Sequence, residues 1–108
     1  MLNINERVRI ADNTSAKHLY RIAQEAVNNA IKHAKAKRIQ VSVGIEGNRG
    51  CLAIRDNGVG LKQSSDKSEG LGMRIMKHRC GLIDAEINID SSYSDGTEIK
   101  CYFSVENS

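Results

Sequence analysis

Three polar residues on one predicted helix have the spacing of a binding surface: Glu25, Asn29 and Lys32. At about 100° per residue they lie within roughly 60° of one another, at the edge of the apolar stripe of the helix. Together they can line a cleft, because an amide oxygen suits Mg²⁺ and an ammonium group suits phosphate. The same pattern is also typical of the solvated face of an amphipathic helix, so the helix alone does not decide between the two interpretations.

A second set of residues combines glycines with a carboxylate. Asp56-Asn57-Gly58-Val59-Gly60 follows a strand pattern, and Gly70-Leu71-Gly72 opens a helix pattern further along. Glycine lets the backbone approach a ligand closely, and the free amides of a helix N-terminus suit phosphate. A carboxylate at the end of a strand can accept a hydrogen bond from an exocyclic amine such as that of adenine. Taken singly, each motif also fits an ordinary turn or helix start.

The elements that must position these residues follow from hydrophobic periodicity. Apolar residues recur at helical spacing from Ala16 to about Lys35 and from Leu71 to about Ile83. Alternation predicts strands over residues 6–11, 38–46, 51–55, 85–90 and 98–105, with a hairpin turn at 47–50 and a loop at 56–68. This order predicts an α/β (α+β) two-layer sandwich. Its sheet is expected to be mixed, largely antiparallel and of about five strands, with helices covering one face.

Length and composition set limits on the function. The 108 residues fit one domain, and the net charge of +3 comes from scattered basic residues, so we expect no nucleic-acid partner. Cys51, Cys80 and Cys101 lie in apolar surroundings and are predicted to be buried, reduced thiols rather than a zinc site or a disulfide framework. The sequence shows no signal peptide and no apolar stretch of membrane-spanning length, which favours a cytoplasmic domain without membrane contact. The abrupt start suggests that residues 1–108 were cut from a longer protein.

The combination of motifs carries more information than any one of them. Residues 24–34 (QEAVNNAIKHA) resemble the N box of histidine kinases, and residues 56–61 (DNGVGL) resemble their first glycine box. Residues 70–76 (GLGMRIM) are similar to the second glycine box, and Asp95-Gly96-Thr97 to the entry of the final strand. The chain thus resembles the ATP-binding catalytic (HATPase) domain of a sensor histidine kinase with the Bergerat-type fold. Residues 19–26 most resemble the nitrate-sensor and membrane-fluidity-sensor subgroup. The same superfamily includes gyrase, heat-shock chaperones and mismatch-repair ATPases.

This resemblance implies a role for residues around the base of ATP. Asp56 is expected to accept a hydrogen bond from the adenine amine, and Thr97 to help hold the base. Gly58 and Gly60 would let the loop pass the base, and His33 would pack beside the nucleotide.

The resemblance also implies roles around the phosphates. Asn29 is expected to ligate Mg²⁺ bridging the phosphates, and Lys32 to contact the phosphates directly. Glu25 stands where related ATPases keep a water-activating base, so a general-base role is possible. Backbone amides of a four-residue segment are expected to bind the phosphates: Gly70, Leu71, Gly72 and Met73.

The expected activity is two-component signal transduction, in which the γ-phosphoryl group of ATP passes to a histidine. His18 and His78 lack the setting of a phosphoacceptor, so that histidine is expected in a dimerisation domain of the same full-length protein. A response regulator would receive the phosphoryl group next. Three alternatives stay open: an anti-sigma-type serine kinase, a non-enzymatic nucleotide-binding module and a gyrase-type ATPase.

Overall fold

The computed structural model describes residues 2–4, 13–32, 35–58, 69–92 and 96–105. They form seven elements in the order expected from the sequence: β1 (Leu2–Ile4), α1 (Asn13–Lys32), β2 (Ile39–Glu46), β3 (Arg49–Asp56), α2 (Glu69–Leu82), β4 (Glu86–Ser92) and β5 (Gly96–Phe103). The strands make one five-stranded sheet in the order β1-β2-β3-β5-β4. The β1–β2 pair is parallel and the other three pairs are antiparallel. The predicted mixed, largely antiparallel sheet is therefore confirmed.

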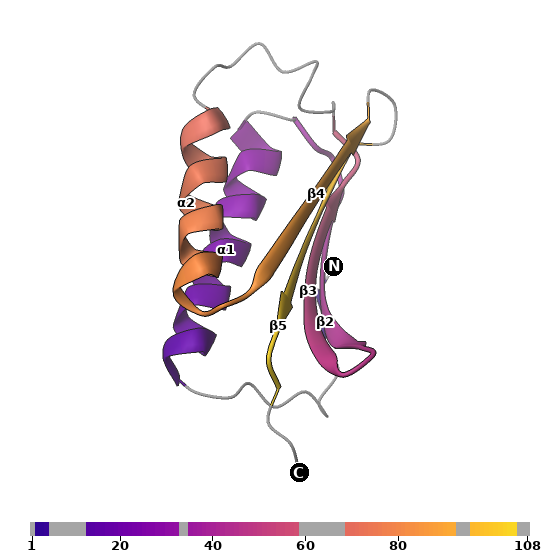
Figure 1. Ribbon diagram of the computed structural model, residues 1–108. Helices are drawn as coiled ribbons and strands as arrows, with labels where there is room; N and C mark the ends of the chain where they lie inside the picture. Colours follow the sequence, from indigo (N-terminus) through magenta and orange to yellow (C-terminus); the bar gives the residue numbers. More distant parts are fainter. Residues whose placement is uncertain (1, 5–12, 33–34, 59–68, 93–95, 106–108) are drawn as a thin grey trace.

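Both helices cover the same face of the sheet, so the molecule has two layers (Figure 1). Helix α1 buries Leu19, Ile22, Ala26 and Ala30, which recur at spacings of three and four and face the sheet in a single stripe. Helix α2 adds Met76 and Cys80 to the same core. Alternate residues of β3 and β5 supply the sheet side of it: Leu52, Ile54, Ile99, Cys101 and Phe103. The periodicities of helix and strand thus converge on one aliphatic core.

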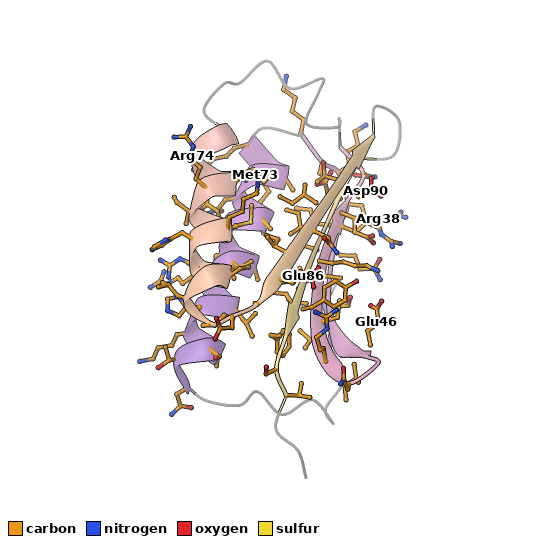
Figure 2. The ribbon with its side chains drawn as sticks, in the orientation of Figure 1. Arg38, Glu46, Met73, Arg74, Glu86 and Asp90 are labelled. Carbon is orange, nitrogen blue, oxygen red and sulfur yellow. The ribbon has the colours of Figure 1, made fainter. Side chains whose placement is uncertain are left out.

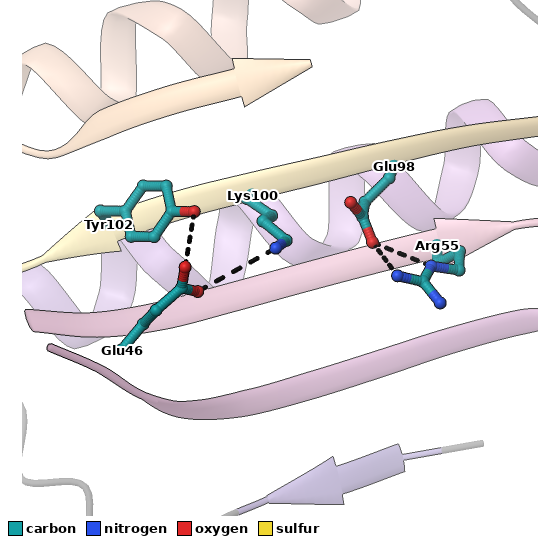
Figure 3. Close-up of polar contacts among 5 residues, drawn as sticks. All are labelled: Glu46, Arg55, Glu98, Lys100 and Tyr102. Carbon is teal, nitrogen blue, oxygen red and sulfur yellow. Dashed lines mark hydrogen bonds and ion pairs between the residues drawn. The ribbon is translucent and has the colours of Figure 1, made fainter. Parts of the chain in front are cut away.

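The opposite face of the sheet carries charged side chains that pair with one another. Arg55 of β3 donates from Nε to Oε2 of Glu98 on β5 at 2.8 Å. Glu46 of β2 accepts from the Tyr102 hydroxyl at 3.4 Å and lies 4.0 Å from Lys100 Nζ (Figure 3). Because these pairs are solvent-exposed, each contributes only a few tenths of a kcal/mol up to about 1 kcal/mol. Their main consequence is that the outer face is polar, which leaves the helix-covered face as the apolar one.

Both helices are followed by a non-glycine residue in the left-handed backbone conformation. Lys35 follows α1 with φ 52°, and Asp84 follows α2 with φ 54°. At the end of α2 the amide of Ala85 donates to the carbonyl of Cys80 at 2.8 Å, and the amide of Asp84 donates to that of Gly81 at 3.3 Å. This is a Schellman motif, in which Asp84 occupies the position that glycine usually takes. It explains how the chain turns into β4 without a glycine at that point.

The three cysteines are free and buried, as the sequence predicts. Cys80 of α2 and Cys101 of β5 meet in the core with their sulfur atoms 3.3 Å apart. The hydrogen bond to Cys80, together with burial, raises the pKa of the Cys101 thiol. Cys51 is opposite Tyr102 in the β3–β5 register and therefore faces the other side of the sheet, where burial raises the pKa of its thiol.

The predicted boundaries are close to those observed, with differences of up to three residues at the ends of several elements. Helix α1 spans 13–32 rather than 16–35, and α2 begins at Glu69 rather than Leu71. The hairpin turn consists of Gly47 and Asn48 alone, so β3 starts at Arg49, two residues earlier than expected. The strand expected over 6–11 and most of the loop expected over 56–68 lie outside the described residues.

The hairpin strands provide a test of the core packing. A β-carbon added at Gly50 would lie 2.3 Å from the ring of Phe103, which is 2% exposed, whereas one added at Gly44 meets nothing within 4 Å. We expect Gly50→Ala to lower the free energy of unfolding by about 1–3 kcal/mol because the buried ring has to shift. Gly44→Ala, the matched control on the adjacent strand, should leave it unchanged or raise it by about 0.5–1 kcal/mol. Urea unfolding measures both, and a Gly50→Ala protein as stable as the wild type would contradict the packing.

Candidate functional site

Glu25 and Asn29 lie one turn apart on α1, and both point toward the first turns of α2. Gly72 is the residue of α2 that they meet. A β-carbon added at Gly72 would lie 2.8 Å from Glu25 Oε1, 2.8 Å from Asn29 Nδ2 and 3.0 Å from Asn29 Oδ1. The absence of a side chain at Gly72 therefore gives these two polar side chains their space between the helices.

The Asn29 side chain has a hydrogen-bond donor that the described residues do not satisfy. Among the described residues, its Nδ2 atom is buried and has no hydrogen-bond partner. A buried amide left without a partner costs about 1–3 kcal/mol, so such an atom points to a ligand that satisfies it. No group of three or more His, Cys, Asp or Glu side chains suitable for a metal occurs in the part of the chain that the structure describes. A metal ion held at Asn29 would thus take its other ligands from a substrate and water, which is how Mg²⁺ usually binds with phosphates.

Asp56 and Thr97 form the second part of the site. Asp56 is the last residue of β3 and Thr97 the second residue of β5, and the two are directly opposite in the antiparallel register. Both are buried, with 7% and 5% of their surface exposed. Asp56 Oδ1 accepts a hydrogen bond from the amide of Gly58 at 2.9 Å, which fixes the orientation of the carboxyl group. A buried carboxylate held in this way can read a donor group on a ligand.

Two residues with a structural role at this site were not among the predicted site residues. Gly96 has φ +82°, and a β-carbon there would lie 2.0 Å from the carbonyl oxygen of Asp56, so only glycine fits beside Asp56. Asn57 accepts hydrogen bonds at its side-chain oxygen from two backbone amides of the α1–β2 connection. The sequence carried a signal for both, since Gly96 precedes a strand and an asparagine after a strand commonly bonds to backbone groups.

The remaining predicted residues have varied environments. Lys32 is the last residue of α1 and is exposed, a position where a cation also complements the helix dipole. Gly70 and Leu71 lie in the first turn of α2, where backbone amides have no intrahelical acceptor. Met73 follows them and packs against the core, while the adjacent Arg74 is exposed (Figure 2). His33 and Gly60 lie outside the described residues.

The two parts of the site share one end of the sandwich. The end of α1, the start of α2, the end of β3 and the start of β5 all lie at the top of Figure 1. The helix layer supplies Glu25, Asn29 and the first-turn amides, and the sheet layer supplies Asp56 and Thr97. Such an arrangement can hold a ligand that has a hydrogen-bonding ring at one end and an anionic group at the other. None of the described helices is long and apolar enough to cross a membrane.

Comparison with known proteins identifies the family of this chain. Residues 14–107 match the family described as histidine kinase-, DNA gyrase B- and HSP90-like ATPase. The nitrate/nitrite sensor protein NarX of Escherichia coli K12 is 34% identical over 95 residues, covering 88% of this chain and 16% of NarX. The kinase/phosphatase DegS of Bacillus subtilis is 42% identical over 84 residues, covering 75% of this chain and 22% of DegS. The chain therefore spans about a fifth of the length of these relatives.

Solved structures show the same fold. The Acinetobacter baumannii histidine kinase AdeS superposes with a TM-score of 0.74 at 18% identity, covering 99% of this chain and 54% of that structure. The ATP binding domain of PrrB from Mycobacterium tuberculosis gives a TM-score of 0.67 at 21% identity, covering 84% of this chain and 69% of that structure. The family model covers most of this chain, and the matching relatives exceed 30% identity, so the chain belongs to the family of histidine kinase-, DNA gyrase B- and HSP90-like ATPases.

Proposed function

We propose that this chain binds ATP together with Mg²⁺ and transfers the γ-phosphoryl group to a histidine of a helical dimerisation domain in the same full-length protein. A response regulator would then receive the phosphoryl group, on the cytoplasmic side where ATP and reduced thiols are found. The observation that carries the proposal is the buried, unpartnered amide of Asn29, held beside Glu25 against the glycine near the start of α2. The relatives that match are sensor kinases, which does not favour an anti-sigma-type serine kinase.

The part of the site on the sheet, Asp56 and Thr97, would recognise the base of ATP. Asp56 has one carboxylate oxygen engaged by the Gly58 amide, which leaves the other to accept a hydrogen bond from the adenine amine. Thr97 lies directly opposite Asp56 and would help hold the base from the neighbouring strand. Guanine has a carbonyl oxygen where adenine has that amine. This oxygen and the Asp56 carboxylate are both hydrogen-bond acceptors, so they would repel each other. The geometry thus favours ATP over GTP.

The part of the site on the helices would hold the phosphates of ATP. Asn29 would supply an oxygen ligand to Mg²⁺, whose charge offsets that of the phosphates. The unpartnered Nδ2 atom of Asn29 can donate to a phosphate oxygen or to a water molecule. The amides of Gly70 and Leu71 would donate to the phosphates from the first turn of α2, and Lys32 would add a positive charge from the end of α1.

Phosphoryl transfer requires mainly positioning and charge stabilisation, so the acceptor has to be brought to the nucleotide. Glu25 would take the proton from the attacking imidazole or orient it. Within the chain, His18 is engaged with Arg79, whose guanidinium donates to His18 Nδ1 at 3.2 Å. His78 lies in the second half of α2, away from the end of the sandwich that carries the site (Figure 1). With His33 predicted to pack beside the nucleotide, we propose that the acceptor histidine belongs to the partner domain.

The role of Asp56 is tested by nucleotide selectivity. Asp56→Ala should weaken ATP binding about ten- to a hundredfold, because a hydrogen bond to a charged group is worth about 1.5–3 kcal/mol. It should also remove most of the preference of the wild type for ATP over GTP. Glu98→Ala, which removes a carboxylate from the outer face of the same sheet, is the matched control and should leave both affinities unchanged. Calorimetry gives the four affinities, and an unchanged ATP:GTP ratio in Asp56→Ala would reject the assignment.

The helix end is tested at Gly72. Gly72→Ala inserts a methyl group at 2.8 Å from Glu25 and Asn29, so we expect it to weaken Mg-ATP binding by about tenfold and adenosine binding by less than about twofold. Gly81→Ala in the same helix meets nothing within 4 Å and should raise the free energy of unfolding by about 0.5–1 kcal/mol without changing either affinity. Titrations with and without Mg²⁺ measure the effect. Equal losses for Mg-ATP and adenosine would mean that Gly72 supports the fold rather than the phosphate end.

Phosphotransfer itself separates a kinase module from a self-sufficient ATPase. With labelled ATP the isolated chain should acquire no acid-labile phosphate, whereas addition of the histidine-bearing helical domain of the same protein should yield label on that domain. Glu25→Gln should slow this transfer about a hundredfold while ATP affinity changes little. Two outcomes would contradict the proposal: stable labelling of His78 in the isolated chain, or rapid Glu25-dependent ATP hydrolysis without the partner domain.

A further inference from the structure

The connection between α1 and β2, described over residues 35–38, is hydrogen-bonded to one exposed side chain at the same end of the β2–β3 pair. Asn57 follows Asp56 at the end of β3. Its Oδ1 atom accepts hydrogen bonds from the amide of Lys37 at 3.0 Å and from the amide of Arg38 at 2.8 Å. The amide of Asn57 in turn donates to the carbonyl of Arg38 at 3.2 Å. Three hydrogen bonds therefore join the connection to the residue beside Asp56.

The same connection is also joined to α1. The amide of Ala36 donates to the carbonyl of Ala30 at 3.0 Å, and Lys35 adopts φ 52° between them. Ala30 directly follows Asn29, the residue proposed to hold Mg²⁺. Asn29 and Asp56 belong to different layers, and this short connection links them through backbone groups rather than through the core.

We propose that Asn57 is a positioning residue, which holds the Asn29 end of α1 in register with the Asp56 carboxylate so that one nucleotide can reach both. The inference rests on the proposed binding of ATP. The links are the hydrogen bonds from Lys37 and Arg38 to Asn57 and from Ala36 to Ala30, joined by the covalent backbone between neighbouring residues. Without the Asn57 oxygen, residues 35–38 would lose two of the three hydrogen bonds that join them to Asn57.

The chemistry of the Asn57 side chain distinguishes a positioning role from a role in core packing. Asn57 is exposed, so its side chain contributes little to the core. Its contribution at this place is an oxygen that accepts two amide hydrogen bonds, which aspartate also provides and leucine, of similar size, does not. The bond that orients Asp56 comes from the Gly58 amide and does not involve the Asn57 side chain. Loss of the oxygen is therefore expected to loosen the link between the two halves while the base-reading half stays intact.

The test compares Asn57→Leu with Asn57→Asp. Asn57→Leu should weaken Mg-ATP binding about tenfold but adenosine binding less than about threefold, because only Mg-ATP spans both halves. Asn57→Asp should restore Mg-ATP affinity to within about twofold of the wild type. A purely structural residue would lower the melting temperature and reduce both affinities alike, without rescue by aspartate.

Hydrogen exchange provides a readout that needs no nucleotide. The amides of Lys37 and Arg38 should be protected in the wild type and in Asn57→Asp, and should exchange faster in Asn57→Leu. Unprotected amides in the wild type, or the absence of a difference between Mg-ATP and adenosine in Asn57→Leu, would overturn this inference alone. A wild-type chain that binds neither adenosine nor Mg-ATP would overturn the proposed function, and this inference with it.

Discussion

Strands β3 and β5 pair at the centre of the sheet in antiparallel register, from Gly50 opposite Phe103 to Asp56 opposite Thr97. This pairing decides at once which side chains form the core and which meet at the site. Inward-facing residues of both strands pack against α1, and the last pair places a carboxylate beside a hydroxyl at the end of the sandwich. A slip of one residue would turn every inward side chain outward and expose Asp56. Because Gly96 has no side chain, its backbone can lie close to the Asp56 carbonyl, as this register requires at the site.

The proposed nucleotide site is divided between the layers, so its geometry depends on how the helices sit on the sheet. The aliphatic stripe of α1 fixes that arrangement in general, because hydrophobic packing is strong but not directional. The finer position of the helices relative to the sheet depends on two local features. One is the space that Gly72 leaves for Glu25 and Asn29, and the other is the pair of hydrogen bonds accepted by Asn57. The polar outer face, with its Arg55–Glu98 pair, takes no part in this arrangement and keeps the sheet covered on one side only.

The sequence predicted the parts of this structure that depend on local pattern. Alternation and helical spacing identified both helices and the four antiparallel strands, because burial on one face imposes a regular period. Asp56 and Thr97 were predicted individually, but their direct opposition depends on a register that no local pattern contains. The left-handed Asp84 was not anticipated, since a non-glycine residue there is stabilised only by the surrounding Schellman hydrogen bonds. The bonds of Asn57 join residues about twenty positions apart, which sequence spacing does not reveal.

The arrangement also explains why such a domain would depend on a partner for its chemistry. Each group at the proposed site would have a binding or orienting role: a carboxylate oriented by a backbone amide, a buried side-chain amide and the backbone amides of a helix start. These groups would lower the barrier by fixing the nucleotide and its charge, which is most of what phosphoryl transfer asks of a protein. The remaining requirement is an acceptor held in line with the γ-phosphate, whereas His18 lies in the first half of α1 in contact with Arg79. Control of the reaction would then lie in how the acceptor domain is presented, because effective concentration dominates the rate once the nucleotide is fixed.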